Sequence, residues 1–241
     1  SVIDPVCVLG AGGYVTGPGG LAAWCKRIPL VIHEQNAVVG TSNRLLSRMA
    51  RRHCEGFPAS FTETAKRVTT GNPVRSEIFQ VPAMQWNGDR PPRLLVLGGS
   101  LGALPLNNLL PGAVAALQQA VRPEIWHQCG RQHVELTSQG YADAGVPARV
   151  EPFITDMAAA YAWADLVVCR AGALTISELA AAGRPAVLIP LPHAIDDHQS
   201  ANAGFLIRQN AALMLAQHTL NTASLAEQLN NLFSQPETLQ A

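Results

Sequence analysis

The sequence is poor in charged and aromatic residues, which make up 14% and 5% of its 241 residues. Its 17 basic and 17 acidic side chains cancel to a formal net charge of zero, so no overall field attracts a polyanion. It also lacks a run of basic residues with interleaved aromatic residues. These absences exclude nucleic-acid binding as the main function, and we expect no nucleic-acid partner.

The chain also lacks any C-x-x-C pair, which argues against the common zinc and redox motifs. Its cysteines are widely spread and lie mostly among apolar residues, so we expect buried thiols in a reducing compartment: Cys7, Cys25, Cys54, Cys129 and Cys169. No apolar run reaches the ~20 residues of a membrane span. Together with 48% hydrophobic residues, these features predict a compact cytoplasmic protein.

What is present is a repeated order of strand, glycine-rich loop and helix. Residues 6–9, 12–20 and 21–26 are predicted to follow this order, and residues 93–97, 98–103 and 109–120 to repeat it. Backbone N–H groups in such a loop and the dipole of the following helix both face a bound anion. The pattern therefore favours phosphate binding, although a structural turn explains a single glycine loop equally well.

The other predicted elements alternate in type. Strands are expected at 29–32, 124–128, 150–154, 165–169 and 186–191, and helices at 43–52, 156–164, 200–209 and 225–233. This alternation predicts parallel, doubly wound sheets. Residues 33–36 end one strand with four polar side chains, at the edge where such sheets hold ligands. The basic face of residues 43–52 is expected to be solvated.

Residues 170–199 contain the most informative stretch. Thr175 and Glu178 have the spacing of a capping box, which predicts a helix that starts there and ends at Gly183. In isolation this spacing indicates that Glu178 only caps its helix. A role in ligand binding requires a second signal.

Six ordered motifs supply that signal: GGYVTGPGG at 12–20, HEQN at 33–36, GNPVR at 71–75, GGSLGA at 98–103, RAGALTISELAAAGRPAVLIP at 170–190 and DDHQSANA at 196–203. Together they closely resemble the MurG family of glycosyltransferases over nearly the whole chain. The resemblance implies an α/β fold of GT-B type, with two Rossmann-like, doubly wound parallel-sheet domains.

The resemblance also implies a domain division. We expect a partial N-terminal acceptor-side domain at 1–82, a linker at 83–92 and a C-terminal UDP-sugar-binding domain at 93–241. Members of the family have a further N-terminal region with a G-G-T-G-G-H loop. We therefore expect an N-terminally truncated chain whose first domain is incomplete.

The implied donor site takes residues from several motifs. Glu178 would accept hydrogen bonds from the ribose diol, the backbone of Ile154 would read the uracil edge, and Gln199 would contact the sugar hydroxyls. Arg75 and Ser100 would meet the phosphates. The remaining substrate-binding residues implied by the resemblance are Asn36, Ala173, Leu174, Thr175, Ile176, Ser177 and Asn202. Leu101 stands where relatives commonly have glutamine.

The implied acceptor side lies in the first block. Its loop would seat the acceptor diphosphate on Gly12, Gly13, Tyr14, Thr16 and Gly17. Trp24 resembles part of a membrane-facing apolar patch, with ordinary core packing as the alternative. His193 and His198 are either ligand contacts or loop residues.

The implied reaction is an inverting transfer of N-acetylglucosamine from UDP-N-acetylglucosamine to lipid I, the undecaprenyl-diphosphate-linked acceptor, which yields lipid II for peptidoglycan. It would take place at the cytoplasmic face of the bacterial inner membrane, on a peripheral protein. No D-x-D motif is present, so we expect no metal and no cofactor. Arg75 and the helix dipole would then stabilise the departing diphosphate.

The family's candidate base lies in the loop that this sequence lacks, and Glu34 is the remaining candidate. The alternative to a transferase is therefore a catalytically incomplete fragment that binds UDP-N-acetylglucosamine. A Rossmann oxidoreductase is disfavoured, because neither glycine loop reads G-x-G-x-x-G with an acidic residue about 20 positions later.

Overall fold

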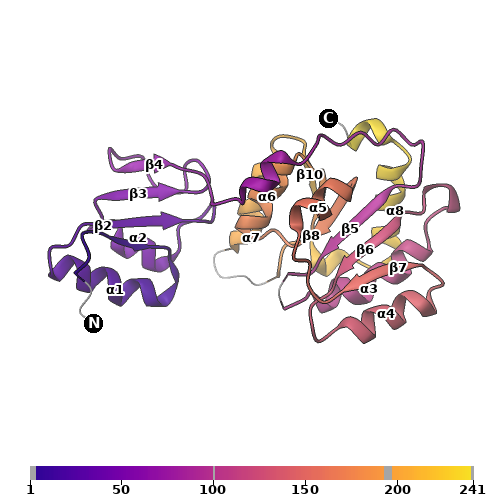
Figure 1. Ribbon diagram of the computed structural model, residues 1–241, viewed down its shortest axis with the longest axis horizontal. Coiled ribbons are helices and arrows are strands. Elements are labelled where there is room, and N and C mark those ends of the chain that lie inside the picture. Colours follow the sequence, from indigo (N-terminus) through magenta and orange to yellow (C-terminus); the bar gives the residue numbers. More distant parts are fainter. Residues whose placement is uncertain (1–3, 100, 193–196, 240–241) are drawn as a thin grey trace. The chain divides into compact units, whose positions relative to one another are not determined.

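The computed structural model describes residues 4–99, 101–192 and 197–239. It contains two parallel sheets, one of four strands and one of six (Figure 1). The chain divides into a first unit of Ser1–Pro73, Gly172–Ser177 and His193–Phe205, and a second unit of Val74–Ala171, Glu178–Pro192 and Leu206–Ala241. The predicted α/β class with parallel sheets is confirmed.

The four-stranded sheet belongs to the first unit and has the order β1 (Val8–Gly10), β2 (Leu30–Glu34), β3 (Arg52–Glu55) and β4 (Arg67–Thr69). Helices α1 (Gly13–Cys25) and α2 (Thr41–Leu46) pack against each other and against β2. Their small apolar core consists of Leu30, Ile32, Val39, Leu46, Ala50 and Phe61.

Three expectations for this unit are wrong. Helix α1 begins at Gly13, so most of the predicted loop at 12–20 is helical. The predicted helix at 43–52 ends at Leu46, and Arg52 already starts β3. Cys7 and Cys25 are exposed; Cys7 lies just before the short β1, and Cys25 is the last residue of α1.

A buried carboxylate explains why β3 has no apolar run. Glu55 is fully buried, and its oxygens accept hydrogen bonds from Thr69 Oγ1 at 2.7 Å and from the backbone N–H groups of Ala59 and Phe61 at 3.0 and 3.1 Å. Burial alone raises the pKa of Glu55, but these hydrogen bonds outweigh it and lower the pKa overall. The strand therefore uses polar residues to fix the loop at its carboxyl end.

The six-stranded sheet belongs to the second unit. Its order is β10 (Ala212–Met214), β9 (Ala186–Leu188), β8 (Leu166–Cys169), β5 (Arg93–Leu97), β6 (Glu124–Gln128) and β7 (Ala148–Glu151). All four residues of β8 are buried, as expected for a central parallel strand covered on both faces. The predicted strand at 150–154 is wrong in its bounds, since β7 ends at Glu151.

The helices that follow these strands are α3 (Leu104–Ala115), α4 (Val134–Asp143), α5 (Met157–Trp163), α6 (Ala173–Ala182), α7 (His198–Ile207) and α8 (Thr222–Phe233). Helix α3 packs on both α4 and α8. It begins five residues before the predicted start at 109, because Pro105 suits the first turn of a helix. Asp156 caps α5 by accepting a hydrogen bond from Ala159 N–H at 2.9 Å.

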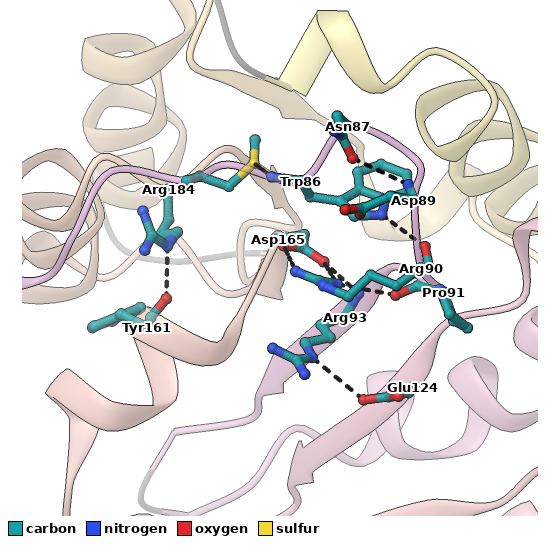
Figure 2. A network of polar contacts seen from close by, with 11 residues as sticks. Trp86, Asn87, Asp89, Arg90, Pro91, Arg93, Glu124, Tyr161, Asp165 and Arg184 are labelled. Atoms are coloured by element: carbon teal, nitrogen blue, oxygen red, sulfur yellow. Dashed lines mark hydrogen bonds and ion pairs between the residues drawn. The ribbon is translucent and has the colours of Figure 1, made fainter.

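The segment at 83–92, predicted as a linker, packs within the second unit (Figure 2). Trp86 is buried and lies edge-on to Phe233 with a centroid distance of 6.1 Å. Its Nε1 donates to Arg90 O at 2.9 Å. Arg90 in turn forms a two-pronged ion pair with the buried carboxylate of Asp165, at 2.7 and 2.9 Å. We call residues 82–92 the strap.

Candidate nucleotide-sugar site

The strand order of the six-stranded sheet changes direction between β5 and β8. The chain runs outward from β5 to β6 and β7 on one side, and from β8 to β9 and β10 on the other. In open parallel sheets, ligands bind outside the carboxyl ends of the strands at such a switch point. The loops at this position are residues 98–103 and 170–172, which both belong to motifs singled out in the sequence.

The loop after β5 is held by a single amide side chain. Gln128 Oε1 accepts from Gly99 N–H at 3.0 Å, and Gln128 Nε2 donates to Gly99 O at 2.8 Å and to Pro152 O at 3.1 Å. Gly102 has a φ of +79°, and a Cβ there would lie 2.1 Å from Cys129 O. Only glycine fits this close approach, which fixes the backbone of the loop at Gly102.

Glu178 lies near the middle of α6 and has two partners in the second unit. Its Oε1 lies 3.2 Å from Arg75 Nη2, and its Oε2 accepts from Tyr161 Oη at 3.0 Å. Burial, together with the adjacent Glu178 carboxylate, raises the pKa of Tyr161 well above its ordinary value. Tyr161 is therefore a neutral hydrogen-bond donor near neutral pH.

The predicted capping box is wrong. Helix α6 begins at Ala173, and its first backbone bond runs from Ile176 N–H to Gly172 O at 2.9 Å. Thr175 consequently lies inside the first turn, and the carboxylate of Glu178 bonds to Arg75 and Tyr161. The T-x-x-E spacing here reflects two residues on one face of a helix that has already started.

Two predicted site residues meet within the first unit. Asn202 Nδ2 donates to Asn36 Oδ1 at 3.1 Å, and Asn202 Oδ1 accepts from Ala37 N–H at 2.8 Å. Ser177 also belongs to this unit and accepts from Asn72 Nδ2 at 3.0 Å. Two side chains of the motif at 71–75 therefore bond to residues of α6: Asn72 to Ser177, and Arg75 to Glu178.

Glu34 is buried and accepts four hydrogen bonds. Its Oε1 accepts from the N–H and Nδ2 of Asn36 at 3.1 and 3.2 Å, and its Oε2 from Gly40 N–H at 3.0 Å and Asn43 Nδ2 at 2.9 Å. A carboxylate offers about four acceptor positions, and a general base needs one for the proton that it removes. The contacts favour a structural role for Glu34, as the clamp of the loop after β2.

The predicted acceptor residues lie at the amino end of α1. Gly12 precedes the helix with a φ of +83°, and Gly13, Tyr14, Thr16 and Gly17 are helical. The residues expected to form an extended loop are thus the first turn of a helix. The first N–H groups of a helix have no partner within it, so this turn can still bind an anion. Trp24 on the same helix is 54% exposed, which contradicts the core-packing alternative.

The remaining predicted residues are placed as follows. Ile154 is buried just beyond β7, Ala173, Leu174, Thr175 and Ile176 form the first turn of α6, Gln199 lies in α7, and His198 begins α7. Ser100 and His193 lie outside the described residues. Among the residues that the structure describes, no helix has the length and apolar character needed to cross a bilayer.

Sequence reasoning missed Tyr161, Gln128 and Asn72. Tyr161 is preceded by three consecutive alanines in α5, and a lone large polar side chain in such a helix is a signal worth following. Nothing in the sequence pointed to Gln128, because many strands end in a polar residue that has no role in a site.

The fold and this site define the class. Two parallel α/β sheets, the larger with a glycine loop at its switch point, are typical of a GT-B glycosyltransferase. The chain belongs to glycosyltransferase family 28: its residues 93–241 match the C-terminal domain model of that family, and residues 2–54 match the N-terminal domain model.

The curated relatives agree with this family. The chain is 62% identical over 239 residues to the UDP-N-acetylglucosamine–N-acetylmuramyl-(pentapeptide) pyrophosphoryl-undecaprenol N-acetylglucosamine transferase of Stutzerimonas stutzeri, covering 99% of this chain and 67% of the relative. It is 61% identical over 237 residues to the protein of the same name from Pseudomonas putida, covering 98% and 66%. The chain thus spans about two thirds of the length of these relatives.

Solved structures give the same fold. Acinetobacter baumannii MurG is 46% identical with a TM-score of 0.81, over 98% of this chain and 67% of that one. A Neisseria meningitidis UDP-GlcNAc 2-epimerase bound to UDP-GlcNAc has a TM-score of 0.64 over 98% of this chain and 70% of that one, at 12% identity. The second likeness concerns the fold alone.

Proposed function

We propose that this chain acts in the transfer of N-acetylglucosamine from UDP-N-acetylglucosamine to lipid I, which forms lipid II for peptidoglycan. The observation that carries the proposal is the carboxylate of Glu178, held between Arg75 and Tyr161 on the helix that follows the central strand β8. The names of the curated relatives supply the substrates.

In the proposed complex, Glu178 accepts hydrogen bonds from the ribose diol, and Ile154 presents its backbone to the uracil edge. Arg75 is 57% exposed and carries a permanent positive charge, which suits a diphosphate. The loop after β5 adds backbone N–H groups for the same ligand charge. These groups stabilise the negative charge that builds on UDP as the glycosidic bond breaks, and no metal ion is required for that task.

The acceptor side of the proposal uses the start of α1 for the lipid-linked diphosphate. Exposed apolar side chains on and near that helix support peripheral contact with the inner membrane at its cytoplasmic face: Leu9, Tyr14, Val15, Leu21 and Trp24. We also propose that the acceptor-side domain ends at residue 82 and that the donor-binding domain begins at residue 93.

The direct test is calorimetric titration of the chain with UDP-N-acetylglucosamine, beside the variants Glu178→Ala and Glu124→Ala. Glu124 is a matched control, because its carboxylate also pairs with an arginine of the second unit, Arg93, at 3.4 Å. Hydrogen bonds to a charged group contribute about 1.5–3 kcal/mol each, so Glu178→Ala should weaken binding at least tenfold and Glu124→Ala should not.

Thermal melting of each variant shows whether a loss of affinity is a loss of fold. Failure of the unchanged chain to bind the nucleotide sugar would refute the proposal. Turnover of a lipid I analogue by the chain then separates the transferase from a module that only binds the donor.

A further inference from the structure

The carboxylate of Glu178 is only partly used by the protein. A carboxylate has about four acceptor positions, two on each oxygen. Tyr161 occupies one on Oε2 and Arg75 one on Oε1, at 3.0 and 3.2 Å. The Glu178 side chain is 15% exposed, so roughly one position on each oxygen is left for two donors that arrive together.

The two protein donors also fix the plane of the carboxylate. Rotation about the last side-chain bond of Glu178 would break the bond to Tyr161 on one oxygen and the bond to Arg75 on the other. Tyr161 is the more rigid partner, because it is fully buried while Arg75 is 57% exposed. The tyrosine hydroxyl therefore sets the orientation, and the arginine adapts to it.

The backbone of Tyr161 is itself anchored by Arg184 (Figure 2). Arg184 is buried, and its Nε donates to Tyr161 O at 2.6 Å. Its other nitrogens donate to Pro82 O at 2.7 Å and Ala182 O at 3.0 Å. These carbonyl groups come from the strap and from the last turns of α5 and α6, where a positive charge is favourable.

We propose that Tyr161 is a positioning residue that prepares Glu178 to accept both hydroxyls of a vicinal diol, and that Arg184 keeps Tyr161 in place. The inference rests on the proposed function for the identity of that diol as the ribose of UDP. It adds a specificity role: selectivity for ribose over deoxyribose depends on a tyrosine that does not itself touch the ligand.

The test compares UDP with 2′-deoxy-UDP by calorimetry on the full chain and on Tyr161→Phe, which removes only the hydroxyl. The unchanged chain should bind UDP about 10- to 100-fold more tightly, because the deoxy compound leaves one carboxylate position unfilled. In Tyr161→Phe this ratio should fall at least about threefold, since the carboxylate is free to turn.

Tyr141→Phe is the matched control. Tyr141 is also buried in the second unit, and its hydroxyl lies 3.0 Å from His127 Nδ1. This variant removes the same buried atom from a different network, so it should lower the melting temperature and leave the ratio unchanged. Arg184→Lys, which keeps the charge but loses the forked geometry, should lower the ratio in the same direction as Tyr161→Phe.

The outcomes separate the positioning role from the proposed function. Failure of the unchanged chain to bind UDP overturns the proposed function itself. Binding with an unaltered ratio in Tyr161→Phe, even with equal weakening of both ligands, overturns only the positioning role. If Tyr161→Phe does not fold, an unaltered ratio in folded Arg184→Lys overturns the positioning role equally.

Discussion

His127 offers the sharpest prediction about stability, because it is a buried histidine with two defined partners. Its Nδ1 lies 3.0 Å from Tyr141 Oη and its Nε2 3.1 Å from Asn107 Oδ1. Since an amide oxygen only accepts, Nε2 carries the proton and Nδ1 accepts from the tyrosine. Burial lowers the pKa of His127 to about 3, so the folded protein keeps this ring neutral.

The magnitude follows from proton linkage. An unfolded histidine has a pKa of about 6.5, so below that pH the unfolded chain binds a proton that the folded chain does not. The stability due to the neutral ring is present above pH 6.5 and is lost as the pH falls from there toward 3. The slope is about 1.4 kcal/mol per pH unit, which gives about 2 kcal/mol between pH 7 and pH 5.

The assay is urea unfolding at pH 7 and pH 5, followed by tryptophan fluorescence, on the unchanged chain and on His127→Gln. Three of the four tryptophans, Trp86, Trp126 and Trp163, lie in the second unit with His127. The variant should lose about 2 kcal/mol less than the unchanged chain between the two pH values. His218→Gln, which changes an exposed histidine, should keep the original slope.

Equal slopes for the unchanged chain and His127→Gln would refute the reasoning. That result would mean that the ring charges in the folded state, or that its surroundings admit water. The absolute stability of His127→Gln does not enter the comparison, because the loss of ring packing is the same at both pH values.

Three further predictions concern the frame of the two units. Gly102→Ala should lower the free energy of unfolding by roughly 2 kcal/mol or more in urea titration, because its left-handed backbone leaves no room beneath a neighbouring carbonyl group; an unaffected midpoint would contradict this. Arg90→Met should cost about 2–3 kcal/mol, less than a fully buried pair because the arginine is 34% exposed, and adding Asp165→Asn should recover part of the loss. Glu55→Gln should lessen the fall in melting temperature in acid. The charge of Glu55 stabilises the fold above about pH 4.3, and this stability is lost as the pH falls through the lowered pKa of the carboxyl. The same acid profile in the variant and the unchanged chain would contradict this.

The apolar central strands could be predicted because burial on both faces leaves a plain hydrophobic run. Residues 94–97 and 166–169 are such runs, and both lie in the middle of the larger sheet. The strands of the first unit were harder to predict from the sequence. Arg52–Glu55 has two buried polar residues, so no hydropathy pattern distinguishes it from a helix end, and neither β4 nor helix α4 was expected.

Predictions from glycine were the least secure. Glycine permits many backbone conformations, and residues 13–20 use this freedom to form a helix with Pro18 inside it. The candidate site was found through the order of its motifs, while the bonds that orient it were not. Tyr161 meets Glu178 across 17 residues, and Arg184 reaches Tyr161 across 23, and such pairings arise only from packing.

The side chain of Gln128 has a consequence for the cost of binding. It joins Gly99, at the proposed phosphate end of the site, to Pro152, two residues before the proposed uracil contact Ile154. The two ends of a nucleotide would then be met by two backbone segments, whose spacing the Gln128 side chain sets before any ligand binds. A ligand that finds such a preset spacing spends little of its interaction energy on ordering the protein. Removing this amide, as in Gln128→Ala, would therefore be expected to weaken binding from a position that touches no ligand in the proposed complex.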